Sequence, residues 1–386
     1  MAQQHLDPTD PTADGAATGD ALARYLRAQA TEFLRALRLH RETGSSQAHG
    51  AEESVDAARL LRRSARRISG SLHTFRPLLD ADWSEEMRPE LAWLSGTLGL
   101  EHACEARLER LLLALHRLSG AAALPAQTVD VMAAGAAAAR VGDGGPPARA
   151  KPSVGEAPGN ASGPANASGP ANVTPTPERG NLTVGAAKAG ALLDRQLTLA
   201  RTRAHSTALQ ALGSSRFHAV ADKVALLASD VPLTRTAPST DLRPLAAAAE
   251  ERLTAAVGAL PLVTAGHPYN AEALVHGLSP DPSPHPQDGP WHQVRLLLRL
   301  HRYAQEVLNG GNAPVDVRLL AAGQALNRHR DASEAAAAAA QAARTPRIAP
   351  ATAYALGVLH ADQRHEVEAA RFAFQQAWQK QTVSAP

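Results

Sequence analysis

The chain has 386 residues, 44% of them hydrophobic but only 3% aromatic, and its 39 basic and 37 acidic residues leave a formal charge of +2. This balance excludes a partner chosen by overall charge, so an electrostatic function has to come from local clustering of charge. A core with so few aromatic side chains has to be built from Ala, Leu and Val, which favours an all-α protein.

Three features of the sequence predict the cellular location. Residues 1–19 are polar, contain no apolar signal core, and are expected to form a disordered tail. No stretch of 18 or more apolar residues occurs, so we expect no membrane span. The single cysteine, Cys104, excludes an internal disulfide and fits a reducing compartment. Together these features predict a cytoplasmic protein.

Helical periodicity then runs along most of the chain. Leu22, Leu26, Phe33 and Leu37 predict a helix over 21–40. A second helix is expected after Ser54, a plausible N-cap. Residues 84–119 predict two amphipathic helices with a break near Gly99. Further helices are expected at about 185–230, 241–258, 269–277, 290–309, 314–342 and 350–380.

The composition changes sharply between 141 and 183. This segment is rich in Gly, Pro, Ala and Asn and repeats the hexapeptide NASGPA. It contains too little apolar surface to fold, so we expect a flexible linker. The helical parts on either side, 20–140 and 184–383, are then expected to be two parts of one domain.

The second predicted helix has a strongly basic face. Leu61, Ala65, Ile68, Leu72 and Phe75 make an apolar stripe that predicts its core side. The neighbouring stripe is basic without interleaved acids, so its guanidinium groups repel one another and favour an anion site. A solvated basic face is the alternative. The basic candidates are Arg59, Arg62, Arg63, Arg66, Arg67, His73 and Arg76.

A later helix repeats this register. His292, Arg295, Arg299 and Arg302 follow at i, i+3, i+7 and i+10. Arg59, Arg62, Arg66 and Ser69 have the same spacing. Two basic helices in one register indicate an internal duplication that brings both faces to a shared groove.

These motifs resemble the CHAD domain, the conserved-histidine α-helical domain, whose duplicated helix follows the pattern H-x-x-R-x-x-x-[RK]-R-x-R. The second basic helix matches it at His292 and Arg295, with Leu300 in place of one basic residue. The first helix departs, with Arg59 where the histidine belongs and Ser69 at the last basic position, and Ala103 replaces a later acid. Similar pieces include "LAWLSGTLG", "LAAGQALNRHRDA" and "YALGVLHADQRHEVEAA".

The resemblance covers residues 20–383 outside the linker and implies a duplicated helical bundle, with two four-helix-like halves around a basic groove. It implies binding of inorganic polyphosphate and association with polyphosphate granules and their proteins. His329 and His360 join the candidate groove residues, and histidine charging would raise affinity as pH falls. The departures at Arg59, Ser69 and Ala103 predict a weaker or specialised first half.

Other functions find less support in the residues. His360, Asp362 and His365 lack the spacing and further ligands of a metal site, so no metal and no cofactor are expected. No catalytic motif occurs, and we expect no enzyme activity. Binding of RNA or other single-stranded nucleic acid is the alternative, although the basic faces carry only Phe75 and Tyr303 for base stacking. A scaffold that recruits proteins through its linker remains a third possibility.

Overall fold

The computed structural model describes residues 18–43, 50–120, 177–267, 271–278, 285–310 and 316–379. Within these ranges the chain is helical and forms no strand, apart from an isolated bridge between Leu79 and Leu233. This confirms the predicted all-α class. The N-terminal tail up to residue 17 and the linker up to residue 176 lie outside the described residues.

The N-terminal helices pack side by side. Helix α1 spans Gly19–Thr43, α2 spans Gly50–Thr74, and α3 spans Ala81–Ser119. Helix α2 packs between α1 and α3. Its predicted apolar stripe, from Leu61 to Phe75, is fully buried, which confirms the core side that the spacing predicted.

Three boundaries differ from the expectation. Helix α2 begins at Gly50, so Ser54 lies inside the helix and the predicted N-cap is wrong. Helix α3 runs without interruption through Gly99, so the predicted break is wrong. A glycine inside a helix weakens it by about 1 kcal/mol relative to alanine, which the packing of a long helix outweighs. Helix α4 spans Pro177–Leu212 and therefore begins inside the segment predicted as linker. Pro177 is compatible with the first turn of a helix, where its missing N–H is not needed.

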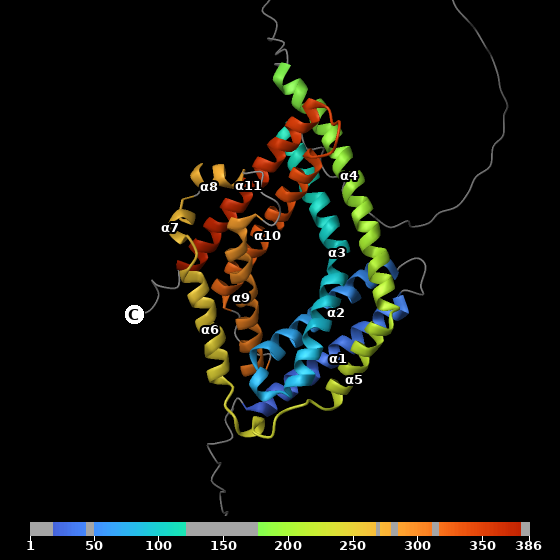
Figure 1. The fold of residues 1–386 in the computed structure, drawn as a ribbon, viewed down its shortest axis with the longest axis vertical. Helices are drawn as coiled ribbons and strands as arrows, with labels where there is room; N and C mark the ends of the chain where they lie inside the picture. Colours follow the sequence, from blue (N-terminus) through green and yellow to red (C-terminus); the bar gives the residue numbers. More distant parts are fainter. Residues whose placement is uncertain are drawn as a thin grey trace, which may run out of the picture.

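The later helices complete the molecule. After α4 come α5 at Ser215–Ser229, α6 at Arg243–Gly258, and the short α7 and α8 at Leu262–Ala265 and Ala271–Gly277. The C-terminal helices are α9 at Gly289–Leu308, α10 at Val317–Ala343 and α11 at Pro350–Gln379. Helix α9 packs against α6 and α10, and α10 packs along α11. In Figure 1 the ribbons of α2, α3, α9 and α10 surround the middle of the molecule.

The hydrophobic cores join residues from both sides of the predicted linker. One core combines α1, α2 and the first part of α3 with α5 and the end of α9. A second joins the end of α3 to α4, α10 and α11. The described helices before and after the predicted linker therefore share their cores, and α3 lies along α4 (Figure 1).

Candidate anion-binding site

The two predicted basic helices meet in space. Helix α2 packs against α9, and Gly70 of α2 faces Tyr303 of α9. A Cβ atom at Gly70 would lie 2.5 Å from Cδ2 of Tyr303 and 3.3 Å from Cδ2 of Leu300, so only glycine fits this contact. Leu300, the position where the second motif departs from the family pattern, is buried here. The contact places the arginines of both helices next to one another.

Five arginines from three helices form one group, called here the arginine cluster. Burial and the charges of Arg299 and Arg330 lower the pKa of Arg295 to about 9. Burial and the charges of Arg62 and Arg299 lower the pKa of Arg66 to about 10. Such shifts arise when like charges are held together away from water. The cluster consists of Arg62, Arg66, Arg295, Arg299 and Arg330.

Most of this charge has no carboxylate partner. Among the described residues, no ion pair joins Arg62, Arg66 or Arg299 to an acid. Arg295 donates from Nε to Oδ1 of Asn327 at 2.8 Å, a neutral partner. Concentrated guanidinium groups without counter-charges are costly for a folded protein, so the cluster is suited to bind an anion.

Glycine 99 makes room for one member. A Cβ atom on Gly99 would lie 2.5 Å from both Cζ and Nη2 of Arg62, so the guanidinium rests directly on the backbone of α3. Burial, followed by the charges of Arg330 and Arg299, lowers the pKa of Arg62. The glycine that sequence reasoning interpreted as a helix break therefore positions a basic group.

Other predicted residues of α2 lie in different surroundings. Arg67 donates two hydrogen bonds to Glu306 of α9, at 2.8 and 3.1 Å. The Tyr25 hydroxyl donates to the same carboxylate at 2.8 Å, and Arg302, which is exposed, lies 3.5 Å from it. This interaction joins α1, α2 and α9, so Arg67 has a structural partner that the α2 sequence alone does not indicate.

The two ends of the predicted α2 face are outside the arginine cluster. Arg59 is exposed and paired with Asp56 at 3.0 Å, while Arg76 pairs with Glu85. His73 contacts Arg88 through Nδ1 at 3.1 Å. Burial and the charges of Arg88 and Arg252 lower its pKa. Arg63 is exposed on α2.

His292 lies at the border of the cluster. It is half-buried, and its Nε2 has no hydrogen-bond partner among the described residues. Burial lowers its pKa, a shift that the charge of Asp288 opposes. Its ring packs edge-on against His329, with 5.5 Å between the ring centroids. The imidazole is therefore neutral near pH 7.

His329 is a core residue. Its side chain is 1% exposed, stacks on Trp291, and accepts from Nε of Arg371 at 3.3 Å. Burial and the charge of Arg371 lower its pKa to about 3. Its neighbour in the sequence, Arg330, reaches the cluster instead. Sequence reasoning selected the histidine of the "NRHR" segment and missed this arginine.

A buried polar network holds the beginning of α9. Asp288 is fully buried and accepts hydrogen bonds from Arg364 at 2.8 Å and Arg371 at 2.7 Å, and from Ser333. Burial alone would raise the pKa of Asp288, but the hydrogen bond and charge of Arg364 outweigh it and lower the pKa to about 2. The network ties α9 to α10 and α11, and so fixes the helix that carries Arg295.

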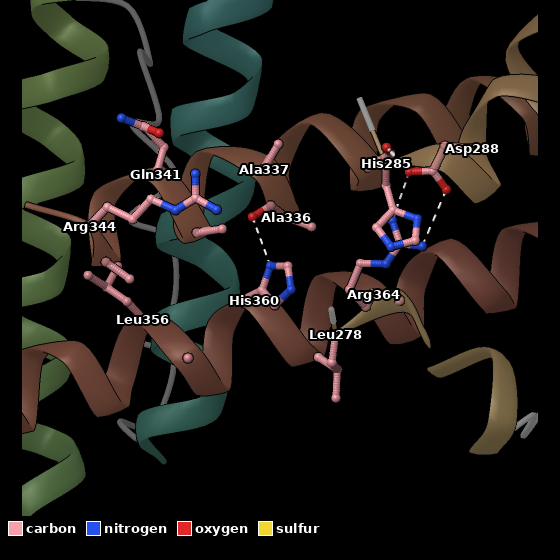
Figure 2. Close-up of a pocket in the computed structure, with 15 residues that line it drawn as sticks. Leu278, His285, Asp288, Ala336, Ala337, Gln341, Arg344, Leu356, His360 and Arg364 are labelled. Carbon is pink, nitrogen blue, oxygen red and sulfur yellow. Dashed lines mark hydrogen bonds and ion pairs between the residues drawn. The ribbon is translucent and has the colours of Figure 1, made fainter. Parts of the chain in front are cut away.

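A separate cavity lies between α10 and α11, close to α8. It measures about 320 Å³ and contains His360, whose Nδ1 donates to the carbonyl of Ala336 at 3.0 Å (Figure 2). Figure 2 also shows Arg364 turned toward Asp288 at one end and Arg344 at the other. No arginine of the cluster lines this cavity, so His360 and the cluster belong to different places.

Among the described residues, no group of three or more His, Cys, Asp or Glu side chains could hold a metal ion. None of the described helices is both long and apolar enough to cross a membrane.

Comparison with known proteins agrees with this architecture. The structure is similar to that of PptA from Streptomyces chartreusis, with a TM-score of 0.69 and 64% sequence identity over 94% of this chain and 99% of that chain. A search among curated proteins found no match. The family model of the CHAD domain matches residues 28–340. The chain therefore belongs to the CHAD domain family.

Proposed function

We propose that this protein binds inorganic polyphosphate without cleaving it, through the arginine cluster of α2, α9 and α10. CHAD domains are associated with polyphosphate. The observation that carries the proposal is the meeting of Arg62 and Arg66 with Arg295 and Arg299, which have no ion pair with an acid among the described residues. The charge of Arg299 contributes to lowering the pKa of Arg66 and of Arg295.

The chemistry of the cluster suits a phosphate chain. Each guanidinium presents a planar set of N–H donors that matches phosphate oxygens, and it stays charged even where its pKa is lowered to about 9 or 10. A linear anion with repeating oxygens can bridge arginines of different helices without any base to recognise. We infer that the chain crosses between α2 and α9, as expected for a shared groove.

Nucleic acid fits this surface less well. Binding of a single strand without sequence preference relies on aromatic side chains on which bases stack. Phe75 is fully buried and Tyr303 is 4% exposed, so neither ring presents a face to a base. The same proposal includes association with polyphosphate granules. It also includes the absence of catalysis, because the sequence contains no catalytic motif.

The test compares polyphosphate with RNA at matched phosphate concentration, by titration calorimetry. A variant with Arg62, Arg66, Arg295 and Arg299 all changed to Ala should lose polyphosphate binding. Arg35→Ala, which removes an exposed arginine of α1 that pairs with Glu32, should retain it.

Two results would contradict the proposal. Equal affinity of the wild type for RNA and polyphosphate would favour nucleic-acid binding. Release of orthophosphate from polyphosphate in the presence of Mg²⁺, lost in the quadruple variant, would show an enzyme.

A further inference from the structure

One carboxylate lies among the basic groups. Glu334 follows Arg330 by one turn on α10 and accepts from Nη2 of Arg107, on α3, at 2.6 Å. It lies 3.8 Å from Nε of Arg330. Its negative charge also acts on Arg62 and on His292. Basic groups from four helices therefore lie within the influence of a single acid, and two of them contact it.

These basic groups offer more donors than Glu334 satisfies. Nε of Arg62 and Nε of Arg107 are buried and have no hydrogen-bond acceptor within the described ranges. Nε2 of the neutral His292 is likewise buried without a partner, and it is a donor in the tautomer that carries the proton on this nitrogen. Buried N–H groups are normally paired, because leaving them unpaired is costly. A carboxylate has two oxygens, whereas a polyphosphate chain presents two non-bridging oxygens on each internal phosphate and three on each terminal one, so consecutive phosphates can satisfy more donors.

We propose that Arg62, Arg107, His292 and Arg330 form a phosphate subsite, and that the Glu334 carboxylate occupies it in the free protein until a phosphate of the ligand displaces it. The proposal rests on the proposed function and deepens it. It adds Arg107 to the binding residues, and it makes Glu334 a residue that lowers affinity by competing with the ligand.

The surroundings of Glu334 allow this exchange. Its side chain is 40% exposed, so it can turn toward solvent without burying its charge. Arg330 keeps a second acid, Asp331, when Glu334 leaves. Arg107 is 22% exposed and has Glu334 as its ion-pair partner, so its guanidinium gains most from a phosphate.

The test is Glu334→Gln, which removes the charge and keeps the shape. The matched control is Glu90→Gln, which removes the same charge from an ion pair with Arg216. Along α3, Glu90 lies about 25 Å from Arg107, the partner of Glu334, at 1.5 Å per residue. Titration with long-chain polyphosphate and with pyrophosphate should show binding tightened roughly threefold to thirtyfold by Glu334→Gln. Glu90→Gln should change affinity less than about twofold, because rim charges contribute little.

A double-mutant cycle assigns the gain to the subsite. Arg107→Ala should weaken binding, and Glu334→Gln should gain little affinity in its presence, since the competed donor is then missing. If Glu334→Gln does not fold, Glu334→Asp replaces it in the test. Its shorter side chain keeps the charge but reaches Arg107 less well, so binding should again tighten.

Each outcome is decisive. Unchanged or weaker binding in Glu334→Gln relative to Glu90→Gln would overturn the competition. A gain that persists in Arg107→Ala would place the effect outside the subsite. If the wild type binds neither polyphosphate nor pyrophosphate, the proposed function fails. The subsite is then tested by sulfate, which should raise the Tm of Glu334→Gln more than that of Glu90→Gln, and equal rises would refute it.

Discussion

A single methyl group on α3 should disable one arginine of the cluster. The Cβ atom of alanine at position 99 would lie 2.5 Å from Cζ and Nη2 of Arg62 and 2.7 Å from its Nε, all too close for real atoms. The guanidinium therefore has to leave its place. Gly96 is the matched control, because a Cβ atom there meets nothing within 4 Å and the position lies on the same helix.

The two substitutions should separate stability from binding. In a helix interior, alanine is more favourable than glycine by about 0.8–1 kcal/mol, so Gly96→Ala should raise the free energy of unfolding by up to about that amount. Gly99→Ala should raise it less, because part of the gain is offset by moving the tip of Arg62. A charge-assisted hydrogen bond contributes about 1.5–3 kcal/mol, and solvent screening reduces it. We therefore expect polyphosphate binding about threefold to thirtyfold weaker in Gly99→Ala.

Thermal unfolding followed by circular dichroism gives the stability, and titration calorimetry gives the affinity. Gly99→Ala should add nothing to the loss caused by Arg62→Ala, since both remove the same contact. Equal affinities of Gly99→Ala and Gly96→Ala would refute the role of this glycine. An unfolded Gly99→Ala protein would refute the argument that only a flexible side-chain tip has to move.

Three further predictions concern the cluster, the buried network and the linker. Single changes of Arg66 or Arg299 to Ala should each weaken polyphosphate binding about threefold to a hundredfold and lower the log–log salt slope by about 0.7, one phosphate contact; loss confined to α2 variants would exclude a shared site. The pKa of His329 is lowered to about 3, so below about pH 6.5 this histidine becomes protonated in the unfolded state while it stays neutral in the folded state. Stability should therefore fall between pH 6.5 and 3, by about 2 kcal/mol at pH 5, and urea unfolding of His329→Gln should show a flatter profile in this window; an equally steep profile would assign the acid sensitivity to other groups. Deleting residues 141–176 should leave helicity and affinity nearly unchanged, and a large loss of either would contradict a linker.

The sequence was sufficient to identify the faces of the basic helices but not all their partners. Periodicity separated Leu61 and Ala65 from Arg62 and Arg66, because helical spacing alone determines which side chains share a face. The family resemblance rested on motifs with the same helical spacing, and the match of the family model confirmed it. Whether an arginine is paired depends on other helices. Glu306 reaches Arg67 only after α2 and α9 have packed.

Long-range packing also explains the missed residues. Nothing in the neighbourhood of Arg107 or Glu334 in the sequence shows that they meet, because the contact joins α3 to α10. His329 follows an arginine and precedes another, as a surface residue would, yet stacking on Trp291 makes it part of the core. Glycine disfavours a helix interior, which is why Gly99 predicted a helix break, but in the structure it is the position against which the Arg62 guanidinium packs.

The shared cores have a consequence for synthesis on the ribosome. Leu61 and Phe33 pack in a core that also needs Phe217 and Val307. After residue 94 emerges, roughly 120 more residues have to be added before Phe217 arrives, which takes on the order of ten seconds at 5–20 residues per second. During this interval the apolar stripes of α1 and α2 have only each other and α3 to cover them. The nascent chain should therefore present these apolar stripes to chaperones during this interval.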